Sequence, residues 1–206
     1  VYLNDESMKV PLEFAHFGAE PLKSASIYWK LADKKGTILQ SGSWTKDLPV
    51  TNSIWIGNMI CDLSSVQTPQ ELILTAGIEG TKVHNEWHIW VYPAEEKKIT
   101  NAPYMTNVFD QQAIDRLEKG ENVLLCVSRG TLRPEKGGNI KVGFSSIFWN
   151  TAWTNKQAPH TLGIYCNPSH PALSLFPTEK YSDYQWWDIV SDCEAIVMDD
   201  FPAEYR

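Results

Sequence analysis

The stretch SASIYWKL, residues 24–31, decides the fold that the first part of this chain predicts. Its apolar residues Ala25, Ile27, Trp29 and Leu31 alternate with Ser26, Tyr28 and Lys30. Because successive side chains of a β-strand point to opposite faces, a period of two predicts a strand with one face in a core.

Turn and strand signals repeat on the C-terminal side of this stretch. DKKG, residues 33–36, predicts a turn, and TILQSGSW, residues 37–44, predicts a partner strand. Further strand-like stretches follow at residues 53–63, 71–78 and 79–93. About seven short strands separated by frequent turn signals are typical of an immunoglobulin-like β-sandwich. Pro93 ends the series, so we expect this domain to span residues 1–93.

The second part of the chain has a different pattern. NVFDQQAIDRLEKG, residues 107–120, predicts a helix, and Gly120 stands where a glycine commonly ends one. NVLLCVS at 122–128 and EAIVMDD at 194–200 are apolar runs, typical of strands buried on both faces. A helix followed by such a strand predicts an α/β domain with parallel strands over residues 94–206. A covering helix is expected after the second run, so we expect this domain to be incomplete.

Charge and cysteine content exclude several classes of protein. The net charge is −7 with no long Lys/Arg run, which argues against nucleic acid or an anionic membrane as a partner. No apolar stretch approaches the roughly 20 residues of a membrane span. The cysteines form no CxxC pair, which excludes the common zinc and thioredoxin motifs, while a disulfide stays open; they are Cys61, Cys126, Cys166 and Cys193. Cys61 and Cys126 lie in apolar runs and are predicted to behave as small buried hydrophobes.

Aromatic residues of the second part form the most specific candidate site. FWNTAWTNKQAPHTLG, residues 148–163, and QWWDI, residues 185–189, combine indoles with Asn, His and Asp side chains. An exposed indole stacks on the apolar face of a sugar ring, while polar side chains reach its hydroxyls. The candidate carbohydrate-binding residues are Trp149, Trp153, His160, Trp186, Trp187 and Asp188. The alternative, which we favour narrowly, is that the aromatic loop locks the α/β domain to its neighbours.

No motif in the sequence predicts a catalytic, metal or cofactor site. The carboxylates around Asp188 are so close together along the chain that a solvated face is the better interpretation than an acid/base pair. His84 and His88 are four residues apart in a predicted strand, too far for a shared zinc ion without a third ligand. Gly137-Gly138 lacks the spacing of a phosphate-binding loop.

Three long stretches carry a resemblance to a known family. They are residues 13–31 (EFAHFGAEPLKSASIYWKL), residues 84–93 (HNEWHIWVYP) and residues 143–189 (GFSSIFWNTAWTNKQAPHTLGIYCNPSHPALSLFPTEKYSDYQWWDI). The chain resembles the C-terminal accessory region of family-two glycoside hydrolases, the β-galactosidase and β-glucuronidase relatives of gut bacteria. In that family an immunoglobulin-like sandwich is followed by an α/β domain similar to class-I glutamine amidotransferases that lacks their catalytic cysteine.

The resemblance implies an accessory role and not a catalytic one. The catalytic glutamates of the family sit on a β/α barrel of about 250 residues, which this chain does not contain. We therefore expect a non-catalytic region that positions domains, mediates homo-oligomer contacts or shapes the substrate cleft. Its implied partners are the rest of the parent polypeptide and a glycan, and the implied location is the bacterial periplasm or exterior. The alternatives are a carbohydrate-binding module and a self-contained glycosidase.

Overall fold

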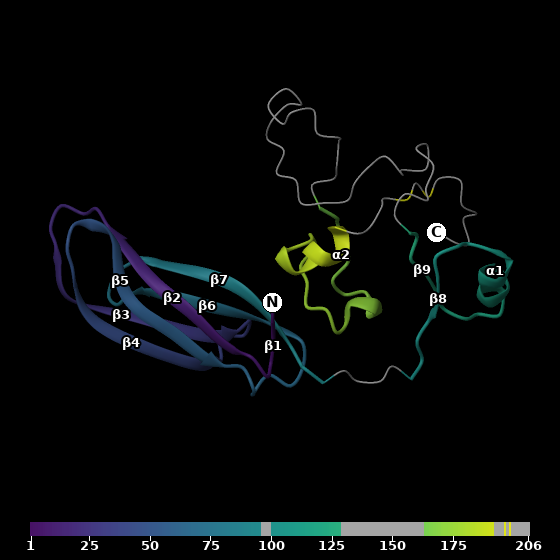
Figure 1. The fold of residues 1–206 in the computed structure, drawn as a ribbon, viewed down its shortest axis with the longest axis horizontal. Helices are drawn as coiled ribbons and strands as arrows, with labels where there is room; N and C mark the ends of the chain where they lie inside the picture. Colours follow the sequence, from purple (N-terminus) through teal and green to yellow (C-terminus); the bar gives the residue numbers. More distant parts are fainter. Residues whose placement is uncertain (96–99, 129–162, 192–195, 197, 199–206) are drawn as a thin grey trace, which may run out of the picture. The chain divides into compact units, whose positions relative to one another are not determined.

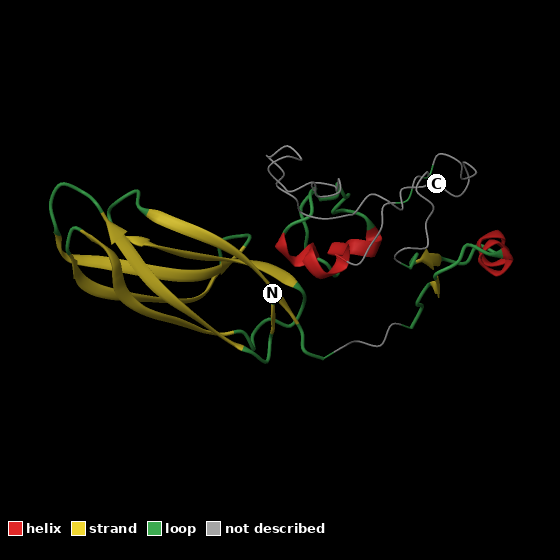
Figure 2. Ribbon diagram, turned by 45° about the horizontal axis from the view of Figure 1, so that its top comes forward, coloured by secondary structure: helices red, strands yellow, loops and turns green. Residues whose placement is uncertain are grey.

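The computed structural model of the chain describes residues 1–95, 100–128, 163–191, 196 and 198 (Figure 1). The chain forms two compact units, one of Val1–Glu96 with Pro168–Thr178 and the other of Lys97–Asn167 with Glu179–Arg206. The described part is rich in β-strands and has few helices (Figure 2).

Seven strands build the first unit. They are β1 (Tyr2–Leu3), β2 (Ser7–His16), β3 (Leu22–Asp33), β4 (Ile38–Leu48), β5 (Thr51–Asp62), β6 (Gln70–Ile78) and β7 (His84–Tyr92). Five of them form one sheet in the order β1-β7-β6-β3-β4, and β2 pairs with β5 in a second sheet. All of these pairings are antiparallel except that of β1 with β7. Figures 1 and 2 show the two sheets as layers of one sandwich.

The alternation predicted for residues 24–31 is confirmed. Ala25, Ile27, Trp29 and Leu31 all point into the core and none is more than 9% exposed. The core lies between the sheets, because Leu31 clusters with Met59 and other residues of the facing sheet. Each fully buried side chain of this size contributes about 1.5–3 kcal/mol through removal of its surface from water.

The predicted turn at residues 33–36 is also confirmed. Gly36 has φ of 86°, in the left-handed region that a glycine adopts without a steric penalty. One carboxylate oxygen of Asp33 accepts the backbone N–H groups of Lys35 and Thr37, each at 2.8 Å. The hydrogen bond from Thr37 is the main reason that the pKa of Asp33 lies below its usual value. The turn thus joins β3 to β4, which pair antiparallel, and the partner strand that the sequence predicts is confirmed.

Two glycines allow indoles to lie flat against strands. A Cβ atom at Gly57 would lie 2.8 Å from the Trp44 ring, and one at Gly42 would lie 2.5 Å from the Trp29 ring. Distances this short do not occur in folded proteins, so any side chain at either position displaces a tryptophan. Both indoles belong to or pack against the core clusters.

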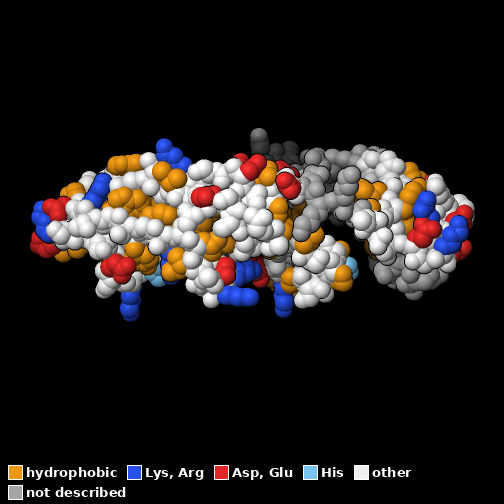
Figure 3. Space-filling view, turned by 90° about the horizontal axis from the view of Figure 1, so that it is seen from below, with side chains coloured by type: hydrophobic (Ala, Val, Ile, Leu, Met, Phe, Trp, Pro, Cys, Tyr) orange, Lys and Arg blue, Asp and Glu red, His pale blue; other side chains and the backbone are white. Residues whose placement is uncertain are grey.

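The sandwich unit also leaves some apolar side chains in solvent. Trp55 is 47% exposed and Ile60 is 57% exposed, both on β5. In Figure 3 the apolar side chains at the surface are interspersed with polar and charged ones. Exposed hydrophobics scattered in this way are ordinary for a soluble protein surface.

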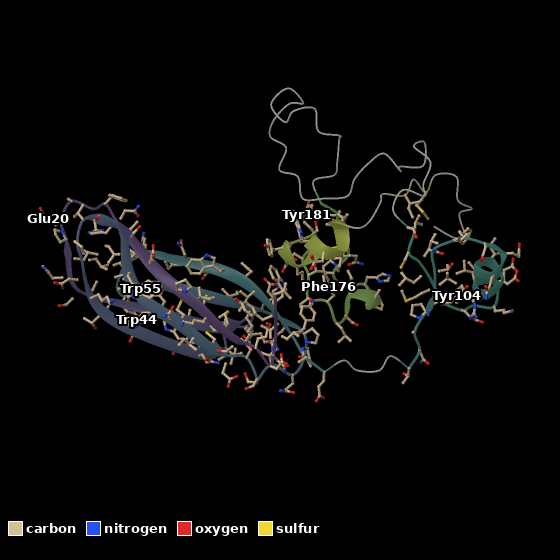
Figure 4. The ribbon with its side chains drawn as sticks, viewed as in Figure 1. Glu20, Trp44, Trp55, Tyr104, Phe176 and Tyr181 are labelled. Atoms are coloured by element: carbon tan, nitrogen blue, oxygen red, sulfur yellow. The ribbon has the colours of Figure 1, made fainter. Side chains whose placement is uncertain are left out.

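Residues Pro168–Thr178, which we call the arm, belong to the sandwich unit although they are far away in the sequence. The arm contains a short 3-10 helix, η2 (Pro171–Leu173), and Nδ1 of His170 accepts the Ala172 N–H at 3.1 Å to cap it. The ring of Phe176 packs against that of Tyr92 with 6.3 Å between centroids. Figure 4 labels Phe176 in the arm.

The second unit begins with a strand–helix–strand segment. Strand β8 (Tyr104–Thr106) pairs in parallel with β9 (Val123–Leu125), and helix α1 (Gln111–Glu118) lies between them in the chain. The described part therefore contains the predicted helix and a parallel strand pair. The prediction that residues 122–128 form a strand buried on both faces is wrong, because Leu124 is 45% exposed. The physical reason is that burial of both faces requires an element packed on each, and in the described part the face that carries Leu124 is left exposed.

Helix α1 ends as the sequence predicts. At its start the Asp110 carboxylate accepts the Ala113 N–H at 3.0 Å. At its end Gly120, with φ of 78°, donates to the Leu117 carbonyl, and Glu121 donates to the Arg116 carbonyl. This pair of hydrogen bonds is a Schellman motif, which satisfies carbonyls that the last turn leaves without helical partners.

Candidate functional site

Half of the predicted carbohydrate-binding residues fall in the described part of the chain. Trp149, Trp153 and His160 lie outside the described residues. The other three, Trp186, Trp187 and Asp188, lie where the 3-10 helix η3 (Tyr184–Trp186) meets α2 (Trp187–Ser191). The described part of the candidate site therefore lies within residues 163–191.

The junction of η3 and α2 separates the two adjacent tryptophans. Asp183 begins η3 by accepting the Gln185 N–H at 3.2 Å, and its other carboxylate oxygen accepts from the Gln185 side chain. Trp186 is 8% exposed and packs inward, whereas Trp187 is 54% exposed. Because neighbouring side chains on a helix point in different directions, one indole is buried and the other reaches solvent. Asp188 is exposed beside Trp187. Ligand binding by these residues stays a prediction.

An antiparallel bridge between Tyr165 and Tyr181 lies in the same unit. Three hydrogen bonds hold it, from Cys166 N–H to the Lys180 carbonyl at 2.8 Å, from Ser182 N–H to the Ile164 carbonyl at 3.0 Å, and from Ile164 N–H to the Ser182 hydroxyl at 3.0 Å. In the sequence, the arm lies between the two segments that the bridge pairs. Figure 4 labels Tyr181 at this point.

The side chains of the bridge are presented to solvent. The Tyr165 and Tyr181 rings pack edge to face, with 5.4 Å between centroids and 71° between planes. They are 70% and 68% exposed, and Tyr184 is 76% exposed. Edge-to-face packing fixes the two rings relative to each other while it leaves ring surface available to a ligand. We call Tyr165, Tyr181 and Tyr184 the tyrosine surface.

The sequence only partly predicts the tyrosine surface. The tyrosines lie between the two stretches that predict sugar binding, residues 148–163 and 185–189, and the predicted site residues are the tryptophans, His160 and Asp188. Tyr165 and Tyr181 are 16 positions apart, and no periodicity predicts that they pair. Only the folded bridge brings the two rings together.

A second polar cluster lies on the face of the five-stranded sheet that points away from the core. The Glu71 side chain is only 2% exposed, with Oε1 2.5 Å from Nδ1 of His88 and Oε2 2.6 Å from Nζ of Lys34. Trp90 lies directly opposite Glu71 across β6 and β7, and its buried indole N–H has no acceptor in the described part. The carboxylate therefore lies buried between two groups that can carry positive charge.

The Glu71 cluster holds an imidazole in place but does not form a metal site within the described part of the chain. A carboxylate that accepts from Nδ1 orients an imidazole and directs its other nitrogen outward. In the described residues, however, no three His, Cys, Asp or Glu side chains are placed to hold a metal ion. The His88 side chain is 54% exposed, so its other ring nitrogen is on the solvent side of the pair.

The cysteines differ in their environment. Cys61 is fully buried between the sheets, and burial raises its pKa to about 11, which confirms its prediction as a small hydrophobe. Cys126 is exposed, so the same prediction is wrong for that residue. The reason is that Cys126 follows Leu124 on the uncovered side of the segment that continues β9.

Comparison with known proteins gives matches to two families. Residues 6–93 match a family model described as Domain of unknown function (DUF8488), and residues 104–206, half of the chain, match one described as Domain of unknown function (DUF8487). No curated protein matches the chain. Among the described residues, no helix has the length and apolar character that a membrane crossing requires.

Proposed function

The chain belongs to the family described as Domain of unknown function (DUF8487), and we propose that it is a non-catalytic accessory region of a glycoside hydrolase. Its role in this proposal is to position domains of the parent polypeptide, which hydrolyses β-galactoside- or β-glucuronide-type glycans. The resemblance of residues 13–31, 84–93 and 143–189 to such accessory regions supports the proposal. We place the parent protein in the bacterial periplasm or outside the cell.

The proposal includes a finer assignment of the two parts. We assign the sandwich to the immunoglobulin-like class, supported by its two facing sheets and by its mainly antiparallel pairing. We assign the second part to the amidotransferase-like α/β class, supported by the parallel pair of β8 and β9 with α1 between them. Contacts between copies of the chain are a further role in this proposal.

The arm is the observation that carries the positioning role. Its residues 168–178 fall inside the family match of residues 104–206. They nevertheless belong to the compact unit that contains the other match, residues 6–93. Phe176 packs on Tyr92 at the end of β7, and Thr178 is 8% exposed. The two matched regions are thus tied by packing as well as by the chain, which favours a structural role for the segment.

A pair of matched variants tests the role of the arm. Phe176→Ala removes the ring that packs on Tyr92, while Leu175→Ala changes a neighbour that is 66% exposed. We expect Phe176→Ala to speed hydrogen exchange in residues 84–92 and proteolytic cleavage of the arm, and Leu175→Ala to leave both unchanged. Equal effects of the two variants would contradict the positioning role.

The accessory assignment has its own test. The gene regions that flank this chain are expected to encode the β/α barrel of a glycoside hydrolase. The 206-residue chain alone is expected to show no turnover of chromogenic β-galactosides or β-glucuronides, and the whole polypeptide to hydrolyse one of the two classes. Turnover by the isolated chain, or flanking regions without a catalytic domain, would overturn the assignment.

A further inference from the structure

We infer that the tyrosine surface, Tyr165, Tyr181 and Tyr184, is a binding site for a neutral glycan. The site goes beyond the positioning role, and it rests on the proposed function only for the carbohydrate context of the chain. The ligand class is an oligosaccharide of uncharged hexopyranoses that stacks its apolar ring faces on the tyrosines.

Exposure of the three rings is the first argument. Each is at least 68% exposed, whereas Tyr is a residue type of intermediate burial whose ring is usually covered in part. The Tyr165 and Tyr181 rings are in contact with each other, and Tyr184 follows Tyr181 by three residues in the sequence. Aromatic surfaces of this kind mark places where a protein meets a ligand.

The order of the backbone beneath the rings is the second argument. The bridge that carries Tyr165 and Tyr181 has hydrogen bonds on both sides of the paired residues, and Tyr184 lies in η3, which Asp183 caps. Exposed aromatic residues on a held backbone lose little conformational entropy when a ligand binds. Edge-to-face packing further restricts the two bridge rings.

The chemistry of the surface matches a sugar. A pyranose has an apolar face and a rim of hydroxyls, so it pairs with rings that have an apolar face and a polar end. Tyrosine supplies both, and the exposed Asp188 offers a carboxylate acceptor in the same segment. A small number of polar groups around aromatic side chains is the usual composition of a small-ligand site.

Charge decides between neutral and anionic sugars. Near the rings in sequence, the carboxylates Glu179, Asp183 and Asp188 outnumber the single amine of Lys180. The whole chain adds to this field with a net charge of −7. Like charges brought together oppose binding, so a uronate is disfavoured and an uncharged galactose- or glucose-type sugar is accepted.

The test compares neutral and anionic ligands of equal length. The full chain is titrated by calorimetry with neutral β-linked gluco- and galacto-oligosaccharides, and in parallel with uronate oligosaccharides. We expect a neutral oligosaccharide to bind with a Kd of about 10 μM to 1 mM, and uronates to bind at least tenfold more weakly. Equal or tighter binding of uronates, or no binding of any neutral sugar, would overturn the inference.

Variants show where the sugar binds, and they separate the contribution of the tyrosine ring from that of its hydroxyl. Tyr181→Ala and Tyr165→Ala are each expected to weaken neutral-sugar binding at least tenfold, whereas Tyr181→Phe retains the ring and loses less. Trp55→Ala, at an exposed aromatic of the sandwich unit, is the matched control and is expected to leave Kd unchanged. Binding that persists in both alanine variants, or capture of a proline-rich peptide by the same rings instead of a sugar, would overturn the assignment.

The outcome is independent of the accessory role. If no neutral sugar binds, the accessory role still stands or falls on its own tests. These are the Phe176→Ala variant for the arm and the gene regions that flank the chain for the catalytic domain. A lack of a flanking catalytic domain, in turn, does not alter whether the tyrosine surface binds an oligosaccharide.

Discussion

The imidazole of His88 holds the buried carboxylate of Glu71, with Nδ1 of His88 2.5 Å from Oε1 of Glu71. Register explains why they meet, since His88 lies opposite Ile73 and therefore shares a face with Glu71, two positions earlier on β6. The second carboxylate oxygen lies beside the Lys34 amine, in the turn after β3. Strands β3, β6 and β7 are thus linked by one carboxylate on the outer face of the sheet.

Removing the imidazole is expected to destabilise the sandwich. His88→Ala leaves a buried carboxylate with one partner fewer, and a lost hydrogen bond to a charged group costs about 1.5–3 kcal/mol. The measurement is the free energy of unfolding in urea at pH 7. The control is the Glu71→Gln variant, in which the charge is already absent. In this background, His88→Ala should lower the free energy of unfolding clearly less. Additive costs in the double variant would show that the two side chains are not coupled.

A methyl group at Gly57 is expected to disturb the core. In Gly57→Ala the new Cβ would lie 2.8 Å from the Trp44 indole, so the ring or the strand must move. Such overpacking typically costs about 1–3 kcal/mol. Thermal unfolding followed by tryptophan fluorescence measures the effect. Ser43→Ala, at an exposed position of β4, is the control, and an equal loss in both variants would refute the explanation.

Acid is expected to weaken the sandwich through Asp47. The Ser24 N–H donates to this carboxylate at 2.8 Å and Lys23 lies 3.0 Å away, and together they hold the pKa of Asp47 below its usual 3.8. Because the folded pKa is lowered, the stabilisation is complete above pH 3.8 and disappears as pH falls through the folded pKa.

The measurement for Asp47 is the urea midpoint between pH 6 and pH 2. In Asp47→Asn this midpoint should fall less on acidification than in the unmodified chain. It should still fall, because the pKa values of Asp33 and Asp62 are lowered in the same direction by backbone hydrogen bonds. An identical acid profile for both proteins would exclude a contribution from Asp47.

Thiol labelling is expected to distinguish two cysteines. Cys61 is fully buried and its pKa is about 11, so little thiolate forms at pH 8. Cys126 is exposed and should react with a maleimide much faster. Peptide mass spectrometry after timed labelling gives the two rates. Urea should abolish the difference, and equal rates in the native protein would contradict the burial of Cys61.

Strand periodicity made much of the sandwich predictable from sequence. Alternation at residues 24–31 holds because a strand between water and a core must separate its apolar side chains from its polar ones. The turn at Asp33–Gly36 and the end of α1 at Gly120 were predictable for a local reason. Glycine adopts positive φ at both places, and no distant residue is needed for it.

Long-range pairing lay beyond the sequence. Nothing in residues 168–178 predicts that they join the sandwich unit, since Phe176 meets Tyr92 only after the chain has folded. The apolar run at 122–128 predicted a strand buried on both faces, but burial depends on which elements cover a strand. In the described part, Leu124 and Cys126 have no such cover.

The sequence by itself determined most strands of the sandwich, the turn at residues 33–36 and the helix α1, because these follow from side-chain periodicity and from local backbone preferences. Tertiary structure alone decided which residues meet. It brought His88 to Glu71, Phe176 to Tyr92 and Tyr165 to Tyr181, because contacts between distant residues are selected by the packing of the whole unit. The tyrosine surface is likewise a feature that tertiary structure decided, because only the folded chain pairs Tyr165 with Tyr181.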